Sequence, residues 1–149
     1  MYKAIVDFVK LSCTAQTPSQ GSEQAAGWDL YADMENDHVT LLPGEVKKIS
    51  TGIAIALPEG TFGAIFARSG MATKRGLAPA NKVGVIDSDY RGPVIVALRN
   101  ESDQAQTITR GERIAQIVVM PYCPIVFNET DSIGTTARGE GGFGSTGSK

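Results

Sequence analysis

Short runs rich in valine and isoleucine alternate with polar and turn-forming positions along most of the chain. None of these runs sustains the 3.6-residue repeat of an amphipathic helix, and each has the length of a strand. In one of them, Ile53, Ile55 and Leu57 alternate with glycine and alanine, which places the large side chains on one face of a strand. We therefore expect β-strands over residues 5–9, 51–57, 62–66, 83–86, 94–98 and 114–120.

Turn-forming sequences separate these runs at short intervals. They lie at residues 43–44, 58–60, 88–92 and 110–112. Many short strands joined by such turns predict an antiparallel sandwich or barrel. Residues 69–76 differ, because Ser69 is a candidate N-cap, basic residues come near the end, and Gly76 stands at the stop. We expect one short helix there.

The composition is that of one globular domain. Of the 149 residues, 42% are hydrophobic and 20% are charged. Folding at this size buries roughly 70% of the surface of the unfolded chain, so the core needs no disulfide or metal. Cys13, Cys123 and the single histidine, His38, indicate neither a disulfide framework nor a zinc site. We expect a reducing, cytoplasmic setting, with His38 in a surface loop.

Charge and hydropathy narrow the possible partners. The net charge of -2 and the isoelectric point near 5.4 argue against nucleic acid, because affinity for its backbone comes from clustered Lys and Arg. No apolar run approaches the roughly 20 residues of a membrane span, and the first residues lack the apolar core of a signal peptide. We expect neither nucleic acid nor a membrane as a partner.

The first candidate site lies at the expected helix start. Arg68, Ser69 and Gly70 place a guanidinium, a hydroxyl and free backbone N–H groups within three positions. Such groups can hold a phosphate or an oxyanion. Alternatively, Ser69 only caps the helix while Arg68 is a solvated surface residue. The segment alone leaves both interpretations open.

The second candidate site is the acidic turn at residues 84–92. A polar hairpin of this kind is most simply a solvated loop, and composition favours that interpretation. However, Asp87 follows Val85 and Ile86, and a carboxylate at the end of a buried apolar run is held rigidly and partly desolvated. Both properties suit a general base.

The third candidate is the glycine-rich C-terminus. A flexible linker needs neither Arg138 nor Phe143, whereas a guanidinium can fork onto a phosphate and a phenyl ring can stack on a flat base. We expect this tail to be mobile when no ligand is bound. A plain linker is the alternative.

Taken together, five segments resemble the five ordered motifs of the homotrimeric dUTPases, the deoxyuridine triphosphate nucleotidohydrolases. They have the order and spacing of that family and span nearly the whole chain. They lie at residues 26–32, 67–72, 81–92, 111–116 and 138–147. Trp28 stands where the family more often has Tyr, and because an aromatic ring is retained we expect no functional change.

The resemblance implies a fold and an assembly. The fold is all-β, a single-domain antiparallel barrel or jelly roll with one short helix and a flexible C-terminal tail. Residues 1–136 would form the barrel, and residues 137–149 the tail that closes over the active site. The tail of each chain would reach a neighbour's site in a homotrimer with composite active sites, so that a monomer is inactive.

The resemblance also implies a reaction. The family uses Mg²⁺ to hydrolyse dUTP to dUMP and pyrophosphate by water attack on the α-phosphorus, which keeps uracil out of DNA and supplies dUMP for thymidylate synthesis. Asp87 matches the base that activates the water. Asp29 and Gln116 match residues that hold metal-bound waters or phosphate oxygens.

Substrate recognition follows from the same resemblance. Asn81 and backbone groups after it would read the edge of uracil and leave no room for a 5-methyl group, while Tyr90 would pack on the deoxyribose and exclude a 2′-hydroxyl. Arg138 would reach the γ-phosphate, and Phe143 would stack on uracil. The implied substrate-binding residues are Arg68, Ser69, Gly70, Asn81, Gly84, Val85, Ile86, Tyr90, Gln116, Arg138, Phe143, Gly144 and Ser145.

Two other functions are compatible with this kind of chain. One is deamination of dCTP on the same trimeric fold, against which the complete motif set argues. The other is a role for the trimer in binding a regulatory partner through its tail, alone or in addition to hydrolysis.

Overall fold

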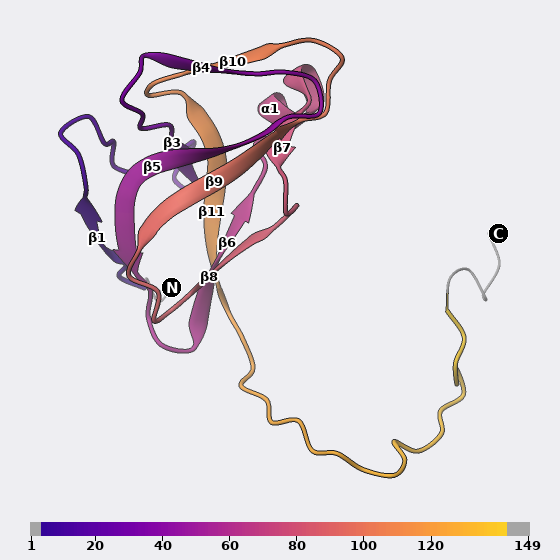
Figure 1. Ribbon diagram of the computed structural model, residues 1–149. Coiled ribbons are helices and arrows are strands. Elements are labelled where there is room, and N and C mark those ends of the chain that lie inside the picture. The colour runs from indigo at the N-terminus through magenta and orange to yellow at the C-terminus, as the bar shows by residue number, and fades with distance from the viewer. Residues whose placement is uncertain (1–3, 143–149) are drawn as a thin grey trace.

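Antiparallel strands and one short helix make up the computed structural model, which describes residues 4–142 (Figure 1). The strands are β1 (Asp7–Lys10), β2 (Ser19–Gln20), β3 (Trp28–Tyr31), β4 (His38–Leu41), β5 (Val46–Ala56), β6 (Thr61–Phe66), β7 (Leu77–Pro79), β8 (Gly84–Asp87), β9 (Pro93–Asn100), β10 (Gln106–Thr109) and β11 (Arg113–Pro121). The helix is α1 (Ser69–Arg75). The predicted all-β, jelly-roll-like class is confirmed.

The strands form three sheets. Five strands pair in the order β2-β3-β11-β6-β8, four in the order β1-β5-β9-β7, and β10 pairs with β4. One hydrophobic core draws side chains from all three sheets, because a sheet is stable only when its apolar face is covered. Its most deeply buried large side chains include Leu30, Leu41, Ile49, Ile53, Leu77, Leu98, Ile108 and Ile114.

All six strands predicted from apolar runs are present, with shifted ends. The strand expected at 51–57 begins earlier, at Val46, and the strand expected at 5–9 spans Asp7–Lys10. Ile53, Ile55 and Leu57 are each less than one-tenth exposed, as their alternation predicted. His38 is exposed as expected, but it begins β4 and does not lie in a loop.

The predicted helix is present, but its N-cap assignment was wrong. Arg68 has extended backbone angles and is the N-cap, so Ser69 is the first helical residue, and no side chain caps the start. The end was predicted correctly, because Gly76 adopts a left-handed φ of 65° that a residue with a side chain rarely takes. Within residues 4–142, no helix has the length and apolar character needed to cross a bilayer.

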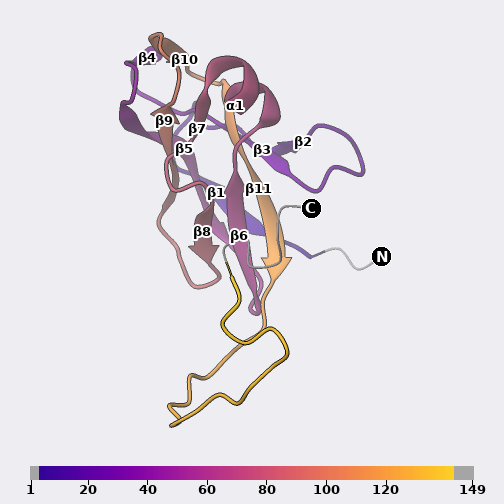
Figure 2. The ribbon, with the colours of Figure 1, turned by 90° about the vertical axis from the view of Figure 1, so that its right-hand side faces the viewer.

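Beyond β11 the chain leaves the sheets. Residues 122–142, called the arm below, contain no helix or strand and run away from the barrel (Figures 1 and 2). A hydrogen bond from the Tyr122 N–H to the Gly60 carbonyl, 3.1 Å long, ties its beginning to the β5–β6 turn. Four large apolar side chains of the arm are at least two-thirds exposed: Ile125, Val126, Phe127 and Ile133.

Candidate active site

An ion-pair cluster joins three segments that are distant in sequence. The Asp29 carboxylate on β3 accepts hydrogen bonds from Arg68 Nε at 2.8 Å and from Arg113 Nη1 at 3.1 Å. Arg68 Nη1 also donates to the Arg113 carbonyl at 3.1 Å. The Asp29 side chain is only 13% exposed, so water screens these contacts less than it would at the surface. We call these three residues the Asp29 cluster; Arg113 is the member to which sequence analysis gave no role.

Gln116 extends the Asp29 cluster on β11. It lies directly opposite Asp29 in the β3–β11 pair, and its amide Nε2 donates to the Ala67 carbonyl at 2.9 Å. Gly27 makes room for this side chain, because a Cβ there would lie 3.1 Å from Gln116 Cδ and closer still to Oε1. Among the described residues, Oε1 has no hydrogen-bond donor, so it is free to accept one from a ligand or water.

Ser69 and Gly70 extend this surface at the start of α1. Both are exposed, and the first amides of a helix have no partner within it. With seven residues, α1 contributes little macrodipole, so Arg68 supplies most of the positive charge. Three of the predicted phosphate-binding positions therefore lie together, next to Asp29 and Gln116.

The residues predicted to read the base lie on or just before the edge strand β8. Among the described strands, β8 pairs only with β6, so one edge of its backbone has no partner strand. Those free N–H and C=O groups can bind a ligand. Gly84 is buried against Ile65, and its Cβ position lies 3.4 Å from Asn81 Nδ2, so a side chain there would crowd the Asn81 amide.

Asp87 ends β8 at a cavity of about 880 Å³. Apart from Asp87, the cavity is lined by residues of the β5–β6 turn, the beginning of β6, β8, its following turn and the arm: Leu57, Glu59, Thr61, Phe62, Val85, Ser88, Asp89, Arg91 and Tyr122. The prediction of a buried run before Asp87 was wrong. Val85 is 60% exposed and Asp87 is exposed, because β8 is an edge strand that only β6 covers.

Tyr90 lies in the turn between β8 and β9. Its N–H donates to the Asp87 carbonyl at 3.1 Å, and its Oη donates to the Pro93 carbonyl at 3.2 Å. Arg91 Nη1 donates to the Ser88 carbonyl at 2.7 Å and to the Tyr90 carbonyl at 3.0 Å. These bonds hold the turn in one shape and leave the Tyr90 ring 42% exposed to a ligand.

One chain does not bring Asp87 and the Asp29 cluster together. Asp87 lies opposite Phe62 near the beginning of β6, whereas Arg68 follows the end of that strand. Six residues of extended chain span about 20 Å. The two groups of candidate residues therefore lie at opposite ends of β6.

Arg138 is the one tail residue with a predicted role that the structure describes. Arg138 is exposed on the arm, where its Nε donates to the Gly141 carbonyl at 2.8 Å. Phe143, Gly144 and Ser145 lie outside the described residues. The predicted closure over the site therefore has no counterpart within residues 4–142.

The described residues contain no cluster of three or more His, Cys, Asp or Glu that could cage a metal. The oxygen-bearing candidates are Asp29, whose carboxylate is already engaged by two guanidinium groups, and Gln116. Such a set suits Mg²⁺, which keeps several waters and takes ligands from substrate phosphates. Asp29 and Gln116 then fit contact through water better than direct ligation.

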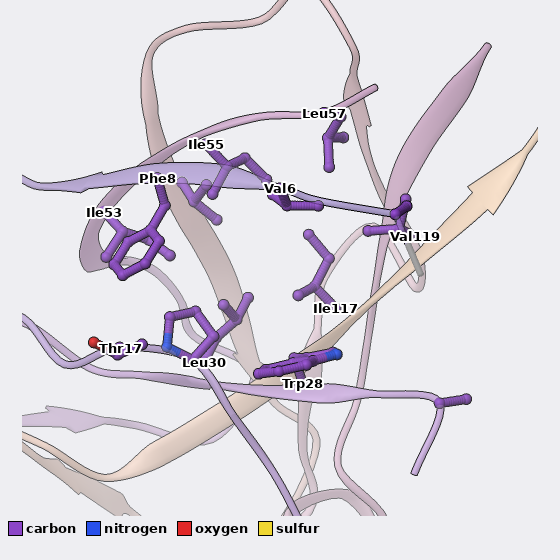
Figure 3. Close-up of a pocket in the computed structure, with 14 residues that line it drawn as sticks. Val6, Phe8, Thr17, Trp28, Leu30, Ile53, Ile55, Leu57, Ile117 and Val119 are labelled. Carbon is purple, nitrogen blue, oxygen red and sulfur yellow. The ribbon is translucent and has the colours of Figure 1, made fainter. Parts of the chain in front are cut away.

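A second, apolar groove of about 430 Å³ lies on the other face of β3. Trp28 points into it, whereas the next residue, Asp29, faces the cluster, as the alternation of a strand requires. Figure 3 shows the groove lined by side chains that include Val6, Phe8, Trp28, Leu30, Ile53, Ile55, Leu57, Ile117 and Val119. Trp28 is 44% exposed, so the groove presents apolar surface to solvent in a single chain.

Comparisons with known proteins point to one family. A family model described as dUTPase matches residues 14–147. The deoxyuridine 5'-triphosphate nucleotidohydrolase of Desulfitobacterium hafniense (strain DSM 10664 / DCB-2) is 45% identical over 146 residues, which cover 97% of this chain and 96% of that protein. The enzyme of the same name from Wolbachia pipientis subsp. Culex pipiens (strain wPip) is 48% identical over 132 residues, 87% of this chain and 86% of that protein. The structure of Staphylococcus bacteriophage 80alpha dUTPase with dUPNHPP superposes with a TM-score of 0.87 at 27% identity, covering 96% of this chain and 98% of that one.

Proposed function

Because the chain belongs to the dUTPase family, we propose that it hydrolyses dUTP to dUMP and pyrophosphate, with Mg²⁺, in active sites shared between the subunits of a homotrimer. The observation that carries the shared site is the position of Asp87 and Arg68 at opposite ends of β6. A base that activates water and the residues that hold the attacked phosphate must both lie within a few ångströms of one phosphorus atom. A second copy of the chain can supply whichever set the first lacks.

Asp87 acts as the general base. Strand pairing and the hydrogen bond from Tyr90 fix its backbone, and its side chain stays accessible to a ligand. The carboxylate takes a proton from water as the water oxygen attacks the α-phosphorus. The bond from that phosphorus to the bridging oxygen breaks, and pyrophosphate leaves with the electron pair. No covalent intermediate with the protein is needed.

Arg68, Ser69 and Gly70 hold the phosphate chain. The ion pair with Asp29 fixes the Nε side of the Arg68 guanidinium, so its remaining N–H groups approach phosphate oxygens in a set orientation. Asp29 and Gln116 Oε1 would hold Mg²⁺ through its water ligands. When bound, Mg²⁺ would supply positive charge that neutralises the phosphate oxygens and makes pyrophosphate a better leaving group.

The exposed edge of β8 reads the base. Backbone groups of Gly84, Val85 and Ile86, together with the Asn81 amide, match the donors and acceptors of uracil and reject the reversed pattern of cytosine. A methyl group in a hydrophobic pocket changes the rate by only about 10 to 200-fold, so a rigid backbone slot that lacks room for it discriminates better. Tyr90 packs on the deoxyribose and excludes UTP.

Two surface features support assembly into a trimer. The apolar groove of Figure 3 and the exposed apolar side chains of the arm would both face water in a single chain. Exposed patches of this kind mark interaction surfaces. Since the arm and the groove are alike in chemistry, the arm of one subunit can cover the groove of another.

The C-terminal tail closes the site. Arg138 reaches the γ-phosphate, Phe143 stacks on uracil, and Gly144 and Ser145 let the backbone approach the nucleotide. We propose that the tail that closes the site begins at residue 137, after residues 1–136, and so includes the last residues of the arm. Closure excludes bulk water and fixes the reacting groups in line. In a cytoplasmic setting this reaction removes dUTP from the precursors of DNA and supplies dUMP for thymidylate synthesis.

Pyrophosphate release by the purified protein with Mg²⁺ tests the proposal directly. dUTP, dTTP, dCTP and UTP are offered in separate reactions, and Asp87→Asn is run beside the unaltered protein. Turnover of dUTP alone, lost in the variant, is the expected result. Release of ammonia from dCTP, with dUTP untouched, would replace this proposal by deamination.

A further inference from the structure

Gly92 lies against the hydroxyl end of the Tyr90 ring. A Cβ built at Gly92 would lie 2.6 Å from Tyr90 Cζ and 3.1 Å from Cε2, with the hydroxyl oxygen closer still. Real Cβ atoms essentially never approach another heavy atom to within 3.0 Å. Any side chain at this position would therefore push the tyrosine ring from its place.

The reason for glycine here is space and not backbone conformation. Seven glycines among the described residues have a left-handed φ, and Gly92 is not one of them. Alanine at this position therefore avoids the left-handed φ that residues with side chains rarely adopt. The close contact that the added methyl group makes is with Tyr90.

Other contacts hold the ring against Gly92. The Tyr90 hydroxyl donates to the Pro93 carbonyl at 3.2 Å, across Gly92, and the Tyr90 N–H donates to the Asp87 carbonyl at 3.1 Å. Arg91 binds the Ser88 and Tyr90 carbonyls and so fixes the turn from its outer side. Together these contacts hold the hydroxyl end of the Tyr90 ring beside Gly92.

We propose that Gly92 is a positioning residue that sets the preference for deoxyribose over ribose by fixing the Tyr90 ring. This inference rests on the proposed role of Tyr90 in packing on the sugar. The Tyr90 ring can exclude a 2′-hydroxyl by steric contact only if it does not move, because a displacement of about 1 Å makes room for the extra oxygen. Gly92 keeps the ring in place without contacting the nucleotide.

The test is a double-mutant cycle of Gly92→Ala and Tyr90→Ala, with kcat/KM measured for dUTP and UTP. We expect Gly92→Ala to lower the ratio of the two kcat/KM values by about tenfold or more, the scale of discrimination by one small group. Tyr90→Ala should lower it at least as much. In the double variant, Gly92→Ala should have no further effect, because the ring it displaces is gone.

Gly21→Ala is the matched control, since a Cβ at Gly21 meets nothing within 4 Å and its φ is not left-handed. That variant should keep the ratio of the unaltered protein, and thermal unfolding checks that every variant is folded. If Gly92→Ala alone fails to fold, selectivity is compared between the double variant and Tyr90→Ala. Equal ratios in those two variants support the inference, and unequal ratios overturn it.

The outcomes separate the inference from the function on which it rests. An unchanged ratio in Tyr90→Ala would contradict the proposed role of Tyr90. A lowered ratio in Tyr90→Ala, with an unchanged ratio in Gly92→Ala, would overturn the inference about Gly92 alone. An equal effect of Gly92→Ala with and without the tyrosine ring would also overturn it, since the effect would not pass through Tyr90.

Discussion

Asp29 and Gln116 face each other across the β3–β11 strand pair, and each is fixed by a different partner. Two guanidinium groups hold the Asp29 carboxylate, and the Ala67 carbonyl holds the Gln116 amide. The segment that contains Ala67 and Arg68 is thus held by Asp29 on β3 and by Gln116 on β11. This pairing brings three separate motifs of the sequence together in one surface, which we propose holds the phosphates and their metal.

Gly27→Ala tests the placement of Gln116. The added Cβ would lie 3.1 Å from Gln116 Cδ and closer to Oε1, so the amide must move away from its present place. We expect the Mg²⁺ concentration for half-maximal activity to rise by about tenfold, the scale on which residues that orient metal ligands act. Activity is titrated with Mg²⁺, with Gly21→Ala as the control. An unchanged titration would show that Gln116 does not act through the metal.

Asp87→Asn tests the general base. Because Asp87 is exposed, the substitution should leave the unfolding transition and nucleotide binding nearly unchanged. The rate should fall by about 10² to 10⁴-fold, as expected when a general base is removed. Single-turnover kinetics and calorimetric binding of a non-hydrolysable dUTP analogue measure the two quantities. Normal turnover by this variant would contradict the assignment.

Two truncations separate the tail from the arm. A chain that ends at residue 137 should keep the mass of the assembly and lose most activity, because it lacks only the residues that close the site. A chain that ends at Pro121 also lacks Ile125, Val126 and Phe127, each of which contributes about 1.5 to 3 kcal/mol when buried in a partner. Light scattering should show that this shorter chain no longer forms trimers. A trimer of unchanged stability would mean that the arm does not cover the groove.

Glu45→Gln tests the turn between β4 and β5. The Leu42 N–H donates to Glu45 Oε2 at 2.8 Å and the Lys47 ammonium lies 3.3 Å from Oε1, which together lower the pKa of Glu45 below its ordinary 4.5. A carboxyl with a lowered folded-state pKa stabilises the fold above its unfolded pKa, and this contribution is lost as pH falls through the folded value.

The unaltered protein should therefore be more stable than Glu45→Gln at neutral pH. The difference should shrink as the pH falls below 4.5 and through the lowered folded pKa of Glu45, because the carboxyl then becomes protonated in both states. Urea unfolding at neutral pH and at a series of pH values below 4.5 measures it. A difference that persists in acid would assign the effect to packing and not to charge.

Apolar periodicity predicted the long strands and two four-residue strands, β1 and β8, but it missed the other short strands. β3 was missed because its four residues include one deeply buried side chain, Leu30, beside the polar Asp29. β2 and β7 are shorter still, and strands of this length are held by their neighbours and not by their own composition. The Ser69 N-cap prediction failed because the helix begins one residue earlier than expected. Arg68 has the extended backbone of an N-cap, and Ser69 is already helical.

Sequence analysis likewise found some features of the candidate site and missed others. The motifs identified Arg68, Asp87 and Gln116, but no local pattern tells that β3 pairs with β11, and so Arg113 was missed as a partner of Asp29. The exposure of Asp87 depends on β8 being an edge strand, which is a property of sheet order. The position of Asp87 and the Asp29 cluster at opposite ends of β6 likewise depends on the register of the β6–β8 pair, which no local sequence pattern shows.

Mixed trimers test the shared site most directly. Arg68→Ala and Asp87→Asn subunits, each inactive alone, are unfolded together in equal amounts and refolded, and dUTP turnover is measured. If each site takes Arg68 from one subunit and Asp87 from another, random mixing leaves about one quarter of the sites with both residues intact, being one half times one half. The account predicts recovery of about that fraction of activity. A mixture as inactive as its two parents would contradict it and place the whole site within one chain.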